Sequence, residues 1–134
     1  KMTLYEKANN PLNIRFNKDN NWKGQTTTLR GFVVFKTPEY GYRAAYVLLC
    51  NYIRKGYNTP RKIITRWAPP TENDTEAYIN YVSKTMDISP DTKIGLENQN
   101  DYWTILILIT TMARIENDLH VQPQDINLAL GKVL

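Results

Sequence analysis

The sequence of 134 residues has few of the side chains that bind metals or form cross-links: one cysteine and one histidine. A single cysteine excludes an internal disulfide, so the fold must be stable through packing alone. Cys50 lies in an apolar stretch, residues 44–53, and we interpret it as a small core residue. His120 without further cysteines or clustered carboxylates does not make a zinc site. We therefore predict no metal and no other cofactor.

Long hydrophobic runs and blocks of like charge are also missing. The apolar run within residues 102–118 is far shorter than the roughly 20 residues that cross a bilayer, and Asp101 and Arg114 bracket it. We therefore expect no membrane span. The formal charge of +4 comes from scattered lysines and arginines. A mildly basic surface suits an anionic polymer such as peptidoglycan or nucleic acid, and it is as often a means of staying soluble.

A chain of this length is enough for one domain with a hydrophobic core and too short for two. We predict a single α+β domain over residues 1–134, mostly helical. Its N-terminal part, residues 1–36, would be a short arm and a small β-hairpin lobe, and residues 37–134 a helical lobe. Residues 13–16 and 31–35 are predicted strands, with a polar loop between them.

Helix start signals recur after the predicted hairpin. Thr37, Pro38 and Glu39 combine a capping residue, a proline of the first turn and an acid that the helix dipole favours, so a helix should run to about Lys55. The same reasoning predicts further helices over residues 60–67, from a capping box at residues 73–76 to about 86, and from 122 to about 131. Residues 89–91 are predicted to form a turn or a short helix.

The most distinctive segment is an apolar helix predicted over residues 102–118. Nearly every face from Trp103 to Ile109 is hydrophobic, which indicates a helix at the centre of a domain. Glu116 lies where this helix ends, and the negative end of the helix dipole favours the protonated form of a carboxylate. Glu116 therefore has the environment of a general acid for cleaving a glycosidic bond.

Several motifs follow one another in an order that resembles a family of small phage and prophage virion structural proteins. They are NNPLNIR at residues 9–15, WKG at 22–24, FVVFKTPEYGYRA at 32–44, ITRWAPP at 64–70, ENDT at 72–75 with Tyr78, and the helix end at 114–117. The resemblance covers most of the chain. It implies a protein of the virion, or of the host cell envelope if exported, with other virion proteins as partners. No signal segment is visible in this chain.

A more distant similarity is to glucosaminidase-type peptidoglycan hydrolases of the lysozyme superfamily. Those enzymes place an acid at a helix end, followed by an N-N-x-F-G-I-K strand, a W-x-G hairpin and an F-R-x-Y-x-S helix start. Here residues 9–15, 22–24 and 32–38 are counterparts of the last three, and residues 112–118 look like the acid-bearing helix. The similarity implies a circularly rearranged lysozyme-like domain with Glu116 near Asn10, Asn13 and Trp22, and peptidoglycan or another glycan as partner.

Under this hypothesis Glu116 is the catalytic acid, and Glu39 is a second catalytic candidate. The substrate-binding candidates are Asn10, Asn13, Arg15, Trp22, Trp67 and Glu72. Each carboxylate also has a structural explanation: Glu39 complements a helix dipole, Glu72 belongs to a capping region, and Glu116 could be an exposed acid at a frayed helix end. The asparagines suit turns. Five tyrosines at helical spacing are interpreted as packing residues: Tyr42, Tyr46, Tyr52, Tyr78 and Tyr81.

Two features weigh against catalysis. Asp118 stands where the hydrolase pattern has glycine, and it could place a second charge beside Glu116. Asp19 is the only acid between residues 7 and 38, so the hairpin offers no clear partner carboxylate. A lytic transglycosylase can nevertheless work with one acid, because the substrate's own hydroxyl completes the reaction.

The leading hypothesis is a peptidoglycan-directed virion protein of phage or prophage origin, acting as a muramidase, a glucosaminidase or a lytic transglycosylase. Its rival is a non-catalytic virion structural or interaction module with the shape of a hydrolase. Nucleic-acid binding through the scattered basic residues is the least favoured alternative, because the sequence has no basic stripe and no recognised motif.

Overall fold

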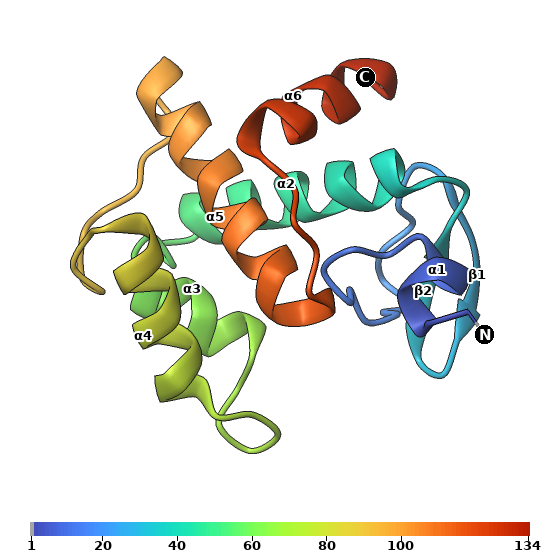
Figure 1. Cartoon of the computed structure of the whole chain (residues 1–134), viewed down its shortest axis with the longest axis horizontal. Helices are drawn as coiled ribbons and strands as arrows, with labels where there is room; N and C mark the ends of the chain where they lie inside the picture. The colour runs from blue at the N-terminus through green and yellow to red at the C-terminus, as the bar shows by residue number, and fades with distance from the viewer. Residues whose placement is uncertain (1) are drawn as a thin grey trace.

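Helices dominate the computed structural model, which describes residues 2–134. Within these residues there are six helices and one two-stranded antiparallel sheet (Figure 1). In chain order they are α1 (Leu4–Ala8), β1 (Gln25–Leu29), β2 (Phe32–Phe35), α2 (Pro38–Arg54), α3 (Pro60–Trp67), α4 (Thr75–Met86), α5 (Gln99–Asn117) and α6 (Pro123–Lys132). The predicted class, α+β and mostly helical with a small hairpin near the N-terminus, is confirmed.

The first helix was not predicted, because residues 1–10 read as an arm. Residue 1 lies outside the described residues, and α1 begins after a capping box. The backbone N–H of Thr3 donates to the Glu6 carboxylate at 2.9 Å, and the N–H of Glu6 donates to the Thr3 hydroxyl at 3.1 Å. Each residue thus satisfies a donor that the helix start leaves without a partner, and this stabilises even a helix of five residues.

The hairpin differs from the predicted one in its first strand. β1 lies inside the segment that was predicted to be a loop, and it pairs with β2. Residues 13–16 form no strand, because Asn13 has a φ of +54°, which interrupts an extended backbone. Arg15 makes only an isolated antiparallel bridge to Phe32.

Gly24 fixes the hairpin lobe to the start of α2. Its φ is +78°, and a Cβ placed on it would lie 2.2 Å from the ring of Tyr40. Only glycine combines this backbone conformation with so close an approach. The Trp-Lys-Gly motif therefore has a packing reason that is independent of any function.

The other predicted helices are found with small shifts. α2, α3 and α6 begin at the prolines that marked them. α4 begins at Thr75 and is capped by Asp74, whose carboxylate accepts from the N–H of Ala77 at 3.1 Å. The predicted cap, Asn73, instead donates to the carbonyl of Pro69 at 3.1 Å. Residues 89–91 form a turn.

The central element is α5, as its apolar sequence indicated. It contacts α2, α4 and α6, and the side chains of Leu106, Leu108, Ile109 and Met112 are fully buried. Ile107 is the exception at 38% exposed. None of the helices described in residues 2–134 combines the length and the apolar character needed to span a membrane. The C-terminal end of α5 lies against the segment between α1 and the hairpin (Figure 1).

Candidate functional site

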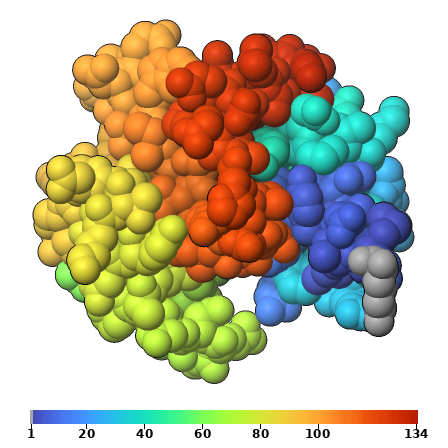
Figure 2. Space-filling model, viewed as in Figure 1, coloured from blue at the N-terminus to red at the C-terminus, as the bar shows by residue number. Residues whose placement is uncertain are grey.

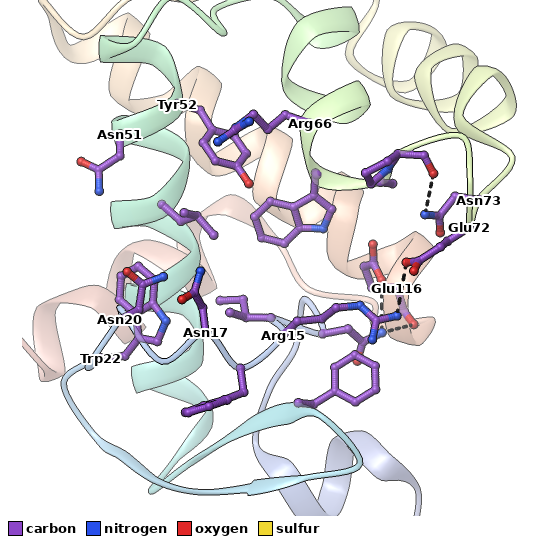
Figure 3. A pocket seen from close by; sticks show the side chains of 18 of the residues that line it. Arg15, Asn17, Asn20, Trp22, Asn51, Tyr52, Arg66, Glu72, Asn73 and Glu116 are labelled. Atoms are coloured by element: carbon purple, nitrogen blue, oxygen red, sulfur yellow. Dashed lines mark hydrogen bonds and ion pairs between the residues drawn. The ribbon is translucent and has the colours of Figure 1, made fainter.

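A groove of about 740 Å³ lies where the N-terminal segment, α2, α3 and the end of α5 meet. Figure 2 shows the surface hollowed between the yellow-green helical segment and the blue N-terminal segment. Figure 3 shows the labelled side chains that surround this hollow. Its lining includes Asn13, Arg15, Asn17, Asn20, Trp22, Asn51, Tyr52, Lys55, Arg66, Trp67, Glu72, Asn73 and Glu116.

Glu116 is held by hydrogen bonds from two segments that are distant in the sequence. The side-chain amide of Asn13 donates to Oε1 at 3.1 Å and to the Glu116 carbonyl at 3.2 Å. The hydroxyl of Tyr78, on α4, donates to Oε2 at 2.9 Å. The carboxylate therefore has a defined position, and it is not an exposed acid at a frayed helix end.

Burial raises the pKa of Glu116, and this effect outweighs all opposing ones. Hydrogen bonds from Tyr78 and Asn13, the polar edge of Trp67 and the charge of Arg15 act in the opposite direction, because they favour the carboxylate. A buried carboxyl with a raised pKa retains its proton to higher pH than an ordinary glutamic acid. This is the property that general acid catalysis requires.

The neighbouring residue, Asn117, attaches the end of α5 to the N-terminal segment. Its amide donates to the carbonyl of Pro11 at 2.8 Å and to Oδ1 of Asn13 at 3.0 Å. These bonds join residues that are more than 100 positions apart. The two parts of the site are thus fixed relative to each other by direct hydrogen bonds.

An ion pair crosses the groove close to Glu116. A guanidinium nitrogen of Arg15 lies 3.8 Å from a carboxylate oxygen of Glu72, and Figure 3 shows this pair beside Glu116. The two side chains are 67% and 65% exposed, so water screens the attraction. Arg15 also lies over the ring of Phe32, 5.0 Å from its centre.

A second hollow, of about 450 Å³, lies on the other side of Glu116. Tyr78, Tyr81 and Ala77 of α4 line it together with Ile115, and it shares Asn73 and Glu116 with the groove. Glu116 therefore lies between two concave surfaces, and an extended ligand could contact both.

Six of the eight predicted site residues line the groove together: Asn13, Arg15, Trp22, Trp67, Glu72 and Glu116. The fold thus brings together residues that are up to about a hundred positions apart in the sequence. The hypothesis required this of Glu116 and the N-terminal lobe. The roles of these residues remain predictions. The ring of Trp22 lines the groove, but its indole N–H is buried without a hydrogen-bond partner in residues 2–134.

Asn10 and Glu39 do not reach the groove. Asn10 is 1% exposed, and its amide donates to the carbonyls of Ile14 at 2.9 Å and Val33 at 2.8 Å. It therefore organises the lobe and is not available to a ligand. Glu39 lies in the first turn of α2. Its charge acts on Tyr5, whose pKa is raised first by the burial of the tyrosine and then by the negative charge of Glu39.

Sequence reasoning missed Tyr78, which lines the second hollow, and several residues of the groove. Tyr78 was interpreted as packing and is indeed buried, but its hydroxyl contacts Glu116. Asn17, Asn20, Asn51, Tyr52, Lys55, Arg66 and Asn73 were not named as site residues. An asparagine-rich loop before the hairpin was the one sequence signal that could have identified two of them.

Asp118, the predicted second charge beside Glu116, is paired elsewhere. It is 82% exposed and pairs with Arg114 at 3.0 Å, and it does not line the groove. In the described part of the chain no group of three or more histidine, cysteine, aspartate or glutamate side chains is placed to hold a metal ion.

Fold and site together describe an α+β protein with a half-buried acid in a groove between a small N-terminal lobe and a helical lobe. No protein-family model matches the sequence. Protein P5 of Pseudoalteromonas phage PM2 is 38% identical over 114 residues, which cover 81% of this chain and 68% of the relative. The chain therefore belongs to the family of this phage protein. The predicted relationship to phage proteins is confirmed; the similarity to the lysozyme superfamily stays a prediction.

Proposed function

We propose that this protein is a virion protein of phage or prophage origin that cleaves the glycan strands of peptidoglycan, with Glu116 as the general acid. The observation that carries the proposal is the position of Glu116 in a groove, half-buried and with a raised pKa. The kinship with a phage protein supports the origin. Peptidoglycan is the barrier that a virion meets at a bacterial surface, and other virion proteins are the expected partners.

The groove suits a sugar polymer. Trp67 and Tyr52 provide aromatic faces, whose rings lie 6.3 Å apart, and aromatic faces of this kind pack on sugar rings. Asparagines on both sides offer donors and acceptors for hydroxyl groups. Since the second hollow continues on the far side of Glu116, a strand can pass the acid and be cleaved at an internal bond.

The proposed reaction begins with transfer of the Glu116 proton to the glycosidic oxygen as the bond to the sugar carbon breaks. The other groove carboxylate, Glu72, is exposed and paired with Arg15, which favours a route with a single acid. In that route a hydroxyl of the same sugar attacks the carbon and gives its proton back to Glu116. The product then ends in an anhydro sugar, as with a lytic transglycosylase.

The test uses purified peptidoglycan, with release of soluble fragments as the measurement. Glu116→Gln keeps the shape of the side chain and removes the proton donor, so we expect release to fall by about 10²–10⁴-fold. Glu97→Gln makes the same change at an exposed position outside the groove and should have no effect. Circular dichroism checks that both variants fold.

The products decide between the routes. Anhydro ends support the single-acid route, whereas reducing ends contradict it and require a water molecule with a second carboxylate. If wild-type protein binds peptidoglycan and releases nothing, the proposal fails and the protein is a non-catalytic module. Release that persists in Glu116→Gln would remove Glu116 from the mechanism.

A further inference from the structure

Two cations line the groove away from Glu116. Lys55 follows the last residue of α2, and Arg66 is on α3. Figure 3 shows Arg66 beside Tyr52, at a distance from the labelled Glu72 and Glu116. The groove therefore has an acid at one side and positive charge at another.

These cations have no ionic partner in the described part of the chain. Among residues 2–134 no carboxylate lies within ion-pair distance of Lys55 or Arg66. The third groove cation, Arg15, differs because Glu72 neutralises it. Net positive charge thus remains at the α2–α3 side of the groove, where packing does not require it.

Aromatic rings hold Arg66 in place. Its guanidinium carbon lies 4.8 Å from the centre of the Tyr57 ring and 5.7 Å from that of Tyr52. Such stacking restrains the side chain and leaves the N–H groups at its edge free to bind an anion. A carboxylate is the group whose two oxygens match a guanidinium edge.

We infer that this side of the groove binds a carboxylate of the peptides attached to the glycan, so that the protein prefers peptide-bearing strands to bare ones. The inference rests on the proposed function and specifies its substrate class. Peptidoglycan differs from neutral glycans in these peptides, which carry free carboxylates. A nucleic acid fits less well, because this side of the groove offers two cations, Lys55 and Arg66, and not a row of cations that would match regularly spaced phosphates.

The experiment compares two soluble glycan fragments of equal length, one with its peptides and one whose peptides an amidase has removed and whose newly freed lactyl carboxylates have then been converted to neutral amides. For each we measure kcat/KM of cleavage and, through tryptophan fluorescence, the affinity. We expect wild-type protein to favour the peptide-bearing fragment about tenfold, as two charge-assisted contacts would provide. The preference should shrink as salt is added.

Paired variants test the residues. Lys55→Gln with Arg66→Gln should remove the preference for peptides. Lys62→Gln with Lys84→Gln makes the same change of charge at exposed positions outside the groove, and this control should keep the preference.

The outcomes separate the inference from the function on which it rests. Cleavage of both fragments at equal rates, or a preference that persists in Lys55→Gln with Arg66→Gln, overturns the inference and leaves the glycosidase intact. Absence of cleavage by wild-type protein overturns the proposed function. In that case the affinities decide: preferential binding of the peptide-bearing fragment that is lost in the groove variant supports the inference, and equal or absent binding overturns it.

Discussion

The floor of the groove, at the end of α5, and its rim, in the loop before α4, each present one glutamate in a different environment. Glu116 on the floor is half-buried, accepts hydrogen bonds from Asn13 and Tyr78, and has a pKa raised by burial. Glu72 on the rim is 65% exposed and pairs loosely with Arg15. The same carboxyl group is thus suited to hold a proton at one place and to stay charged in water at the other.

The two glutamates also differ in how many parts of the fold contribute to their contacts. Floor contacts come from three elements distant in sequence, so they exist only when the whole chain has folded. The rim pair joins two flexible, solvated side chains and contributes little stability. Changes at the floor should therefore have large consequences, and the same changes at the rim small ones.

The largest expected effect is on glycan cleavage. Glu116→Gln should reduce the rate by about 10²–10⁴-fold, whereas Glu72→Gln should reduce it by less than about tenfold, because it removes only a screened ion pair. Rates of fragment release from purified peptidoglycan give both values. Equal losses in the two variants would mean that the floor and the rim act as a pair of carboxylates.

The second prediction concerns the packing of the N-terminal lobe, which carries Asn13, against the start of α2. Gly24→Ala should destabilise the protein by about 2–4 kcal/mol, from backbone strain and a clash with Tyr40. Gly31→Ala is the matched control: its φ is +83° and nothing lies within 4 Å of the new Cβ, so only the strain, about 1 kcal/mol, should remain. Urea unfolding measures the difference, and equal losses would contradict the close packing of Gly24 against Tyr40.

A third prediction concerns stability and pH. Because the pKa of Glu116 is raised in the folded state, charging it costs stability as the pH rises from its ordinary value through the raised one. Glu116→Gln removes this cost, and its melting temperature at neutral pH should be higher than that of the wild-type protein. Melting curves from pH 4 to 8 should converge at the acid end. A variant less stable than wild type throughout would show that the carboxylate stabilises the fold.

The smallest expected effect is a shift of the pH profile. Tyr78 lowers the pKa of Glu116 through its hydrogen bond, so Tyr78→Phe should raise that pKa further and move the alkaline limb of activity to higher pH. Tyr81→Phe, an exposed tyrosine on the same helix, should leave the profile in place. A shift to lower pH in Tyr78→Phe would contradict the hydrogen-bond geometry.

Much of the fold could be predicted from the sequence, because its signals are local. Pro38, Pro60 and Pro123 mark helix starts through their fixed backbone angle, and the apolar run of α5 marks the core. The first strand could not be predicted, because β1 is a threonine-rich segment with a burial pattern that does not alternate. This segment becomes a strand because it pairs with β2, and such pairing cannot be read from the residues of β1 alone.

Some of the candidate site residues could also be proposed from local features of the sequence. Glu116 was proposed because a helix end is a local feature, whereas Asn13, which contacts it, and Trp22, which lines the same groove, were proposed through a resemblance. Tyr78 was missed because only the packing of α4 on α5 gives its hydroxyl a partner. Asn10 was proposed as a substrate-binding residue because a turn-forming asparagine and a sugar-binding one look alike in a sequence, and the structure buries it.

The central claim is that the fold holds Glu116 in a state that keeps its proton. Carbon-13 NMR of labelled glutamate side chains tests it, with the Glu116 signal identified by its loss in Glu116→Gln. We predict a titration midpoint above 4.5, the ordinary value for a glutamic acid. A midpoint at or below that value would show a solvated or ion-paired carboxylate, and Glu116 would then not be the acid of this groove.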